Sequence, residues 1–206
     1  MQGQQEMKTA RLEAFSDGVI AVIITIMVLE LHVPEARGLE GLWHLAPRLG
    51  LYLLSFLLVG IYWINHHELL RRTETANYRV LWSNLVFLFM LSLVPFFTDY
   101  VGEKHFDAFS VAMYAVVMLL VGQGFLVLRL SLNALHRSRG EVLQKQDRAE
   151  TAKHFASLAL YLIAIPTAYY RPVVSLLMNF LVTLIWIVPE LGTRRPHDGA
   201  GRIHTA

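Results

Sequence analysis

Long uninterrupted runs of apolar residues are the feature that most limits how this chain can fold. A continuous apolar run of about 18 or more residues is typical of a membrane-spanning helix, because about 20 helical residues cross the hydrocarbon core of a bilayer. The candidate spans are Ala14–Val33, Leu49–Leu70, Val80–Phe97, Ala108–Leu128, Phe155–Tyr170 and Val173–Val188. The last two are separated only by Arg171 and Pro172, which predicts a helical hairpin. The runs lack the alternation of a lipid-facing barrel, so the sequence predicts an all-α membrane protein with six transmembrane helices.

The distribution of basic residues predicts the orientation in the membrane. If both termini are cytoplasmic, fourteen Lys and Arg residues lie in inner segments and only Arg37, Arg48, Lys104 and Arg171 lie in outer loops. Short cytoplasmic loops are enriched in Lys and Arg, so we expect both termini to be cytoplasmic. The net charge of +2 and the pI near 9.0 then reflect topology. No basic stripe with interleaved aromatic residues indicates a nucleic acid partner.

The segments outside the spans are too short to form a second domain. Residues 1–206 are therefore predicted to be a single transmembrane domain. Residues 131–154 are rich in Arg, Lys, Gln and Glu and are predicted to be a cytoplasmic linker that continues the fourth helix. Residues 193–206, which are rich in glycine and charged residues, are predicted to be a disordered tail.

Charged residues bracket the first span, where contact with lipid is unfavourable. Asp17 lies near its start and Glu30 near its end. A charged side chain costs about 2.5–3.5 kcal/mol at the centre of a membrane helix and less toward the ends. The placement predicts a helix that faces protein or water on one side.

An apolar stripe runs along this same span. Val22, Ile26 and Leu29 fall at i, i+4 and i+7, on one face of a helix, and Thr25 lies beside them. Such a stripe could line a narrow pore, in which rings of apolar side chains gate by dewetting. The alternative is that these side chains pack against neighbouring helices, and the spacing by itself favours packing.

Two strings of residues resemble a known family. The first is Arg11-x-x-x-Phe15-Ser16-Asp17, followed by Gly18-Val19-x-Ala21 and Thr25, and the second is Trp63-x-x-His66-His67. Both resemble the transmembrane protein 175 family, the endosomal and lysosomal potassium channels and their prokaryotic relatives. We call Phe15, Ser16 and Asp17 the FSD motif. The resemblance covers the whole six-helix chain, although its specific motifs lie in the first two spans.

The resemblance implies a function and an assembly. Animal members carry two six-helix repeats, so the single repeat here implies a prokaryotic homotetramer in the cell membrane, with four first helices around a central pore. The pore would conduct K⁺ passively across the lipid bilayer, without any cofactor. The family lacks the carbonyl filter of ordinary potassium channels, which agrees with the absence of a TVGYG-like loop in this sequence.

The resemblance also implies roles for residues of the first span. Val22 takes the position of the main constriction and Thr25 that of the selectivity-associated threonine. Further apolar rings fall at Ile26 and Leu29. The family usually has a larger isoleucine or leucine where this chain has Val22, so the constriction is looser here or the narrowest ring lies at Ile26 or Leu29.

The FSD motif has a structural role in this interpretation. With Arg11, its Ser16 and Asp17 would form a hydrogen-bond network at the cytoplasmic base of the pore, with His66 or His67 as partners. A buried Asp paired with Arg or His satisfies both charges, and removal of one partner leaves the other unpaired. Glu30 would lie at the outer pore mouth, where a carboxylate ring concentrates cations, or it is an ordinary interfacial charge.

Enzymatic and transport functions are the alternatives. The adjacent His66 and His67 form a single histidine box, whereas membrane metal oxidases need several, and the chain has no cysteine. No pair of base and nucleophile can be assembled. The sequence therefore predicts neither catalysis nor a bound metal. A secondary ion or solute transporter remains the alternative to a channel, with Thr25, Gln123 and Asn179 as the polar candidates near the midplane.

Overall fold

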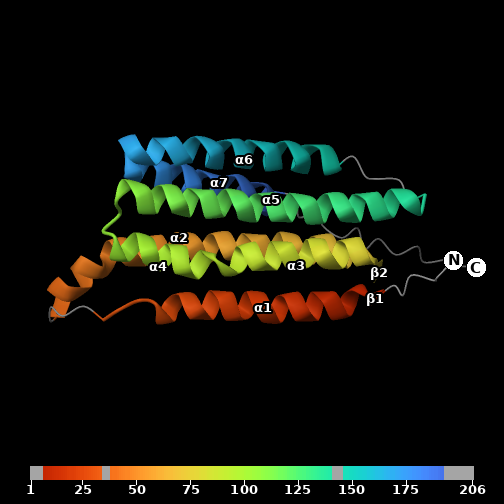
Figure 1. The fold of residues 1–206 in the computed structure, drawn as a ribbon, viewed down its shortest axis with the longest axis horizontal. Coiled ribbons are helices and arrows are strands. Elements are labelled where there is room, and N and C mark those ends of the chain that lie inside the picture. The colour runs from red at the N-terminus through yellow and green to blue at the C-terminus, as the bar shows by residue number, and fades with distance from the viewer. Residues whose placement is uncertain (1–6, 34–37, 141–145, 193–206) are drawn as a thin grey trace, which may run out of the picture.

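A computed structural model describes residues 7–33, 38–140 and 146–192. Along the chain, the described elements are β1 (Met7–Lys8), α1 (Thr9–Leu29), α2 (Gly38–Arg71), β2 (Thr75–Ala76), α3 (Tyr78–Ser92), α4 (Val94–Glu103), α5 (Ala108–Ser138), α6 (Gln146–Tyr170) and α7 (Pro172–Gly192). The helices run back and forth along one long axis (Figure 1). One end, the strand end, holds β1, β2, the end of α5 and the start of α6. The opposite far end holds the end of α1 and the α4–α5 and α6–α7 connections.

The predicted all-α fold with six helical units is confirmed. Only Leu93 separates α3 from α4, so the two form one unit, and Pro95 lies in the first turn of α4, where its missing N–H costs nothing. Among the described residues, four units are long and apolar enough to cross a membrane: Thr9–Leu29, Gly38–Arg71, Tyr78–Glu103 and Ala108–Ser138. The predicted hairpin is also present, because α6 ends at Tyr170 and α7 begins at Pro172.

The helices are longer than the apolar runs. The second helix begins at Gly38, so most of the segment before Leu49, which had been assigned to an outer loop, is helical. Helix α5, which contains the fourth predicted span, likewise continues past Leu128 to Ser138. Hydropathy marks only the part of a helix that matches lipid, whereas the backbone hydrogen bonds of a helix continue into water. Of the predicted 131–154 linker, residues 141–145 lie outside the described residues, as does the predicted tail.

Two short strands tie the start of α1 to the connection between α2 and α3. Met7 pairs with Ala76 and Lys8 with Thr75 in an antiparallel register. The amide of Thr9 also donates a 3.1 Å hydrogen bond to the carbonyl of Glu74. These strands are not predictable from the sequence, because two residues are too few to show an alternating pattern. The pairing fixes where α1 begins.

Side-chain caps set the starts of two further helices. The side chain of Asn77 accepts a 3.1 Å hydrogen bond from the amide of Val80 at the start of α3. Asp107 does the same for α5, with a 2.6 Å bond from the amide of Ser110. Both are favoured capping residues. The hydrogen bonds from Ser110 lower the pKa of Asp107, because they stabilise its ionised form.

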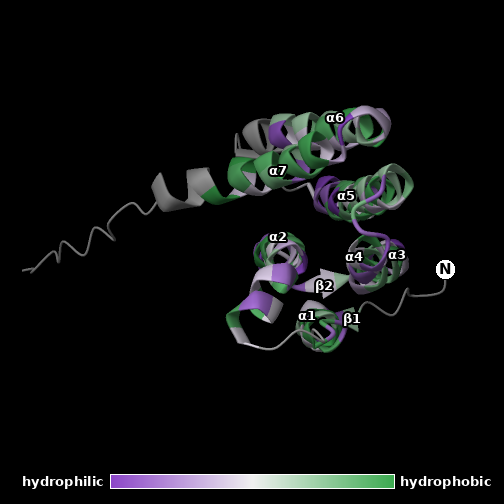
Figure 2. Cartoon of the chain, turned by 90° about the vertical axis from the view of Figure 1, so that its left-hand side faces the viewer, coloured by the Kyte–Doolittle hydropathy of each residue, from purple (hydrophilic) through white to green (hydrophobic). Residues whose placement is uncertain are grey.

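Helix α1 lies at one edge of the bundle and α5 near its middle (Figure 2). Helix α5 packs against α3, α4, α6 and α7, and α1 packs against α2, α3 and α4. The backbones of α5 and α3 come close at Gly124, where an added Cβ would lie 3.1 Å from the Cα of Phe87. As an edge helix, α1 is left with a wide face that the rest of the described chain does not cover.

Candidate functional site: the two faces of helix α1

Helix α1 has one buried and one exposed face, and both are apolar. The buried face consists of Thr9, Leu12, Ser16, Ile20, Ile23 and Met27. The opposite face presents Val22, Ile26 and Leu29, which are 55%, 39% and 79% exposed. Val22, Ile26 and Leu29 therefore do not pack against other helices within the described part of this chain. Their exposure leaves them free to face lipid, another subunit or a pore.

An open groove of about 680 Å³ runs along α1 beside the α3–α4 unit. From α1 it is lined by Ala14, Phe15, Gly18, Val19, Val22, Ile23, Ile26 and Glu30, and from the α3–α4 unit by Ser92, Pro95, Phe96 and Asp99. The groove brings Phe15 of the FSD motif together with Val22 and Ile26. It does not include Thr25 or Leu29, which are exposed farther around the helix.

The side chain of Thr25 is exposed but its hydroxyl proton is used within α1. Its Oγ1 donates to the carbonyl oxygens of Ala21 and Val22, each at 3.0 Å. A hydroxyl that donates to the backbone keeps its oxygen lone pairs free to accept. The Oγ1 of Thr25 thus remains able to coordinate a cation on an otherwise apolar face of the helix.

A buried chain of hydrogen bonds joins α1, α2 and α3. The Nε2 of His66 donates to Oδ1 of Asn84 at 2.7 Å, and the Nδ2 of Asn84 donates to Oγ of Ser16 at 2.9 Å. The hydroxyl of Ser16 in turn donates a hydrogen bond to the carbonyl oxygen of Leu12 at 2.8 Å. Each donor meets an acceptor, so the direction of the chain is fixed. The ring of His66 stacks on Phe87, 5.6 Å between centroids, and its Nδ1 is buried without a hydrogen-bond partner in the described part of the chain.

Two further contacts between α1 and α2 lie nearer the surface. The Nε1 of Trp63 donates to Oδ1 of Asp17 at 2.8 Å, and Nδ1 of His67 lies 2.6 Å from Oε1 of Glu13. Ser16, Asp17, His66 and His67 thus all join α1 to its neighbours. His66 and His67 do so in separate contacts and do not converge on one point. Arg11, the remaining predicted member of the network, is exposed and takes part in none of these bonds.

Sequence reasoning missed Asn84 and Glu13 and gave Trp63 no part in the network. Asn84 is 1% exposed and connects both predicted partners, Ser16 and His66. The available signal was a lone asparagine inside the apolar run Val80–Phe97, since a polar side chain buried in a bundle needs a partner. The side chain of Gln123, one of the polar candidates for a transporter, is exposed.

Comparisons with known proteins identify the family. Residues 11–95 match the TMEM175 family, described as endosomal/lysosomal potassium channel TMEM175. A relative from Chryseobacterium sp. (strain P1-3), named as a potassium channel, is 40% identical over 185 residues, or 89% of this chain and 95% of the relative. The chain belongs to the TMEM175 family. A potassium channel of Streptomyces collinus is 35% identical over 126 residues, covering 57% of this chain and 61% of that relative.

The fold agrees with a solved TMEM175 structure. The crystal structure of a lysosomal potassium-selective channel TMEM175 homolog from Chamaesiphon minutus matches with a TM-score of 0.71. The match covers 91% of this chain and 98% of that one at 24% identity. TMEM175 is an ion channel family, in agreement with the prediction that the chain is not an enzyme. The chain is thus a multi-pass membrane protein with the TMEM175 fold.

Proposed function

We propose that this chain is a potassium channel that conducts K⁺ passively across the cell membrane of a prokaryote. The observation that carries the proposal is the relative from Chryseobacterium, which is named as a potassium channel and matches over nearly its full length. The matches cover nearly the full lengths of this relative and of the Chamaesiphon homolog, so the three chains are of similar length. The basic residues around the strand end support a cytoplasmic location for that end, because short cytoplasmic loops are enriched in Lys and Arg.

The proposed assembly is a homotetramer in which four copies of α1 surround a central pore. The exposed face of α1 supports this assembly, because it holds large apolar side chains along the whole helix. Exposed apolar patches of this extent often mark interfaces with other subunits or with lipid. A single copy of α1 lies at the edge of its own bundle, where it is accessible to other copies.

In this pore, Val22, Ile26 and Leu29 form apolar rings and Thr25 supplies an oxygen acceptor. Apolar rings of this kind restrict conduction by dewetting when they are narrow. Because valine is smaller than leucine or isoleucine, we assign the narrowest rings to Ile26 and Leu29. Their spacing puts about one helical turn between successive rings.

The hydrogen bonds of Ser16 and Asp17 hold α1 in position and do not bind ions in this proposal. Ser16 is fully buried and bonded to Asn84, so it has no access to a pore. Asp17 is bonded to Trp63 on the side of α1 that faces α2. Glu30, at the far end, lines the groove together with Asp99, and we propose that it attracts cations at the outer mouth.

The test is ion flux from liposomes that contain the purified protein, with either a K⁺ or a Na⁺ gradient and a fluorescent readout of compensating proton movement. Valinomycin added at the end reports whether the vesicles are intact. Potassium flux that exceeds sodium flux and does not saturate with concentration supports the channel. Saturable flux coupled to a second ion would instead favour the transporter, and no flux from an intact tetramer contradicts both functions.

A further inference from the structure

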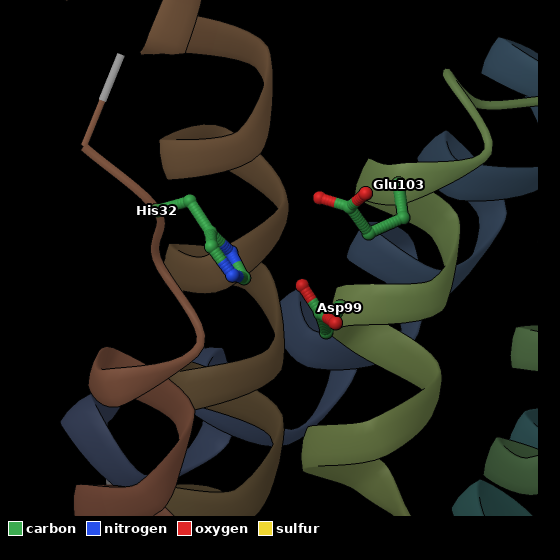
Figure 3. Close-up of side chains that lie close together, drawn as sticks. All are labelled: His32, Asp99 and Glu103. Atoms are coloured by element: carbon green, nitrogen blue, oxygen red, sulfur yellow. The ribbon is translucent and has the colours of Figure 1, made fainter. Parts of the chain in front are cut away.

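A histidine and two carboxylates converge at the far end of the molecule (Figure 3). His32 follows α1, and Asp99 and Glu103 lie on α4. One ligand atom from each side chain lies within 4.8 Å of the other two. Asp99 and Glu103 are separated by four residues, so they share one face of α4. Figure 3 shows the ring of His32 turned toward both carboxylates.

The ring of His32 is held in the form that can bind a metal. Its Nδ1 lies 2.9 Å from the carbonyl oxygen of Glu30, and a carbonyl can only accept, so Nδ1 carries the proton. The lone pair of a neutral ring is then on Nε2. Histidines that bind metals almost always donate their other ring N–H to a carbonyl, carboxylate or water in this way. The bond to Glu30 therefore orients His32 for coordination.

The charges around the cluster favour a cation of charge two. The charged groups that face Asp99 are Glu103 and Glu30, which are acidic, and Arg48, which is basic. Arg48 lies with Nη1 2.9 Å from Oε1 of Glu103, which leaves Oε2 of that carboxylate available. The carboxylates outnumber the guanidinium, so a bound dication would relieve the repulsion between the acidic groups.

We propose that His32, Asp99 and Glu103 form a binding site for a divalent transition-metal ion such as Zn²⁺, with water completing the coordination. One imidazole and two carboxylates suit Zn²⁺, which takes three protein ligands and water at open sites. Ligands about 2.1 Å from a tetrahedral Zn²⁺ lie about 3.4 Å apart. Ligand atoms that lie within 4.8 Å of one another therefore need to approach by at most about 1.4 Å. His32 and Glu103 are exposed and Asp99 is partly exposed, so rotation of these side chains can make this approach.

The ion would join two elements of the chain at the far end. His32 lies in the segment that leaves α1, whereas Asp99 and Glu103 belong to the last turns of α4. A metal bridge between them fixes the end of α1 against the bundle. Because an ion that binds only the folded protein stabilises it by mass action, Zn²⁺ should raise the melting temperature. This site does not depend on the proposed function.

The experiment is isothermal titration of the full chain, purified in detergent and stripped of metal, with Zn²⁺ at neutral pH. The test variants are His32→Ala and Asp99→Asn. The control is His44→Ala, which removes an exposed histidine of α2 at the same end that is not part of the cluster. We expect one Zn²⁺ per chain and a raised melting temperature in the unchanged protein and in the control. Both test variants should bind about 10–100-fold more weakly or worse, since loss of even an outer partner of a ligand costs that much.

Two results would overturn the site. One is Zn²⁺ affinity in both test variants equal to that of the unchanged protein, and the other is an equal loss of binding in the control. Circular dichroism and elution volume show whether each variant retains its helices and its assembly. If His32→Ala were misfolded, Asp99→Asn and Glu103→Gln, which change no side-chain volume appreciably, would still decide the question.

Discussion

Nε1 of Trp63 lies 2.8 Å from Oδ1 of Asp17 and donates a hydrogen bond that joins α2 to α1. The bond accounts for an acidic residue at the start of an otherwise apolar helix, because a carboxylate that accepts a hydrogen bond is partly compensated for its loss of water. The same indole ring lies 6.3 Å from the ring of His67, whose Nδ1 contacts Glu13. Both contacts hold α1 against α2 at the level of the FSD motif.

Replacement of Asp17 by alanine should impair assembly. The variant loses the bond to Trp63, so α1 can rotate or shift against α2, and the faces that meet in the proposed tetramer no longer match. We expect loss of the tetramer on native electrophoresis. Asp17→Asn keeps an oxygen acceptor for Trp63 and should assemble better than Asp17→Ala. A fully assembled Asp17→Ala tetramer would contradict a role of this bond in holding the subunit interface.

Trp63→Phe tests the donor of the same bond. Phenylalanine keeps most of the apolar contact but cannot donate, so we expect destabilisation of about 1 kcal/mol, the usual net contribution of a hydrogen bond. The measurement is the melting temperature of the purified protein in detergent. Trp43→Phe is the matched control, because Trp43 is 80% exposed near the start of α2. Equal shifts in both variants would mean that the loss of indole area, and not the bond to Asp17, sets the result.

Asn84→Ala should destabilise the fold more strongly than either of these changes. It leaves the Nε2–H of His66 without an acceptor and Oγ of Ser16 without its donor, both in a buried place. Each unpaired buried group costs about 1–3 kcal/mol. Asn65→Ala is the control, since the amide of Asn65 only donates to the carbonyl of Ile61 within α2. A melting temperature lowered no further in Asn84→Ala than in Asn65→Ala would show that the buried chain adds little stability.

Val22→Ala and Ile26→Ala should weaken the preference of the channel for K⁺ over Na⁺. A smaller side chain widens an apolar ring, and a wider ring admits ions with more of their water. The two fluxes in the liposome assay should therefore become more alike. Val127→Ala, on α5 and 47% exposed, is the control for an exposed valine outside the proposed pore. Unchanged selectivity in both test variants would remove Val22 and Ile26 from the pore.

The sequence predicted the bundle well because a bilayer imposes a length and a composition on each helix. It predicted the motif partners of α1 less completely. Ser16 and His66 were both identified, but the residue that joins them, Asn84, lies on the third helical unit, and sequence spacing carries no information about contacts between helices. The break at Leu93 lies two residues before Pro95, and a proline ring is disfavoured in the interior of a helix.

The far end was the least predictable part of the site. Glu30 was identified from its position at the end of an apolar run. The cluster of His32, Asp99 and Glu103 was not, because His32 and Asp99 are far apart in the sequence and come together only when α4 packs beside α1. In the sequence His32 has only Glu30 and Glu35 close to it, and neither belongs to the cluster, so the spacing gives no metal signal.

Gly124→Ala should destabilise the packing of α5 on α3. The added Cβ would lie 3.1 Å from the Cα of Phe87, and a backbone atom of a neighbouring helix can move away only if the helix itself moves. Overpacking of this kind costs about 1–3 kcal/mol. Gly60→Ala is the control, because a Cβ at Gly60 meets nothing within 4 Å and alanine is about 1 kcal/mol better than glycine inside a helix. We expect a lower melting temperature for Gly124→Ala and an equal or higher one for Gly60→Ala. A Gly124→Ala protein as stable as the Gly60→Ala control would mean that α3 and α5 can separate at this crossing without loss.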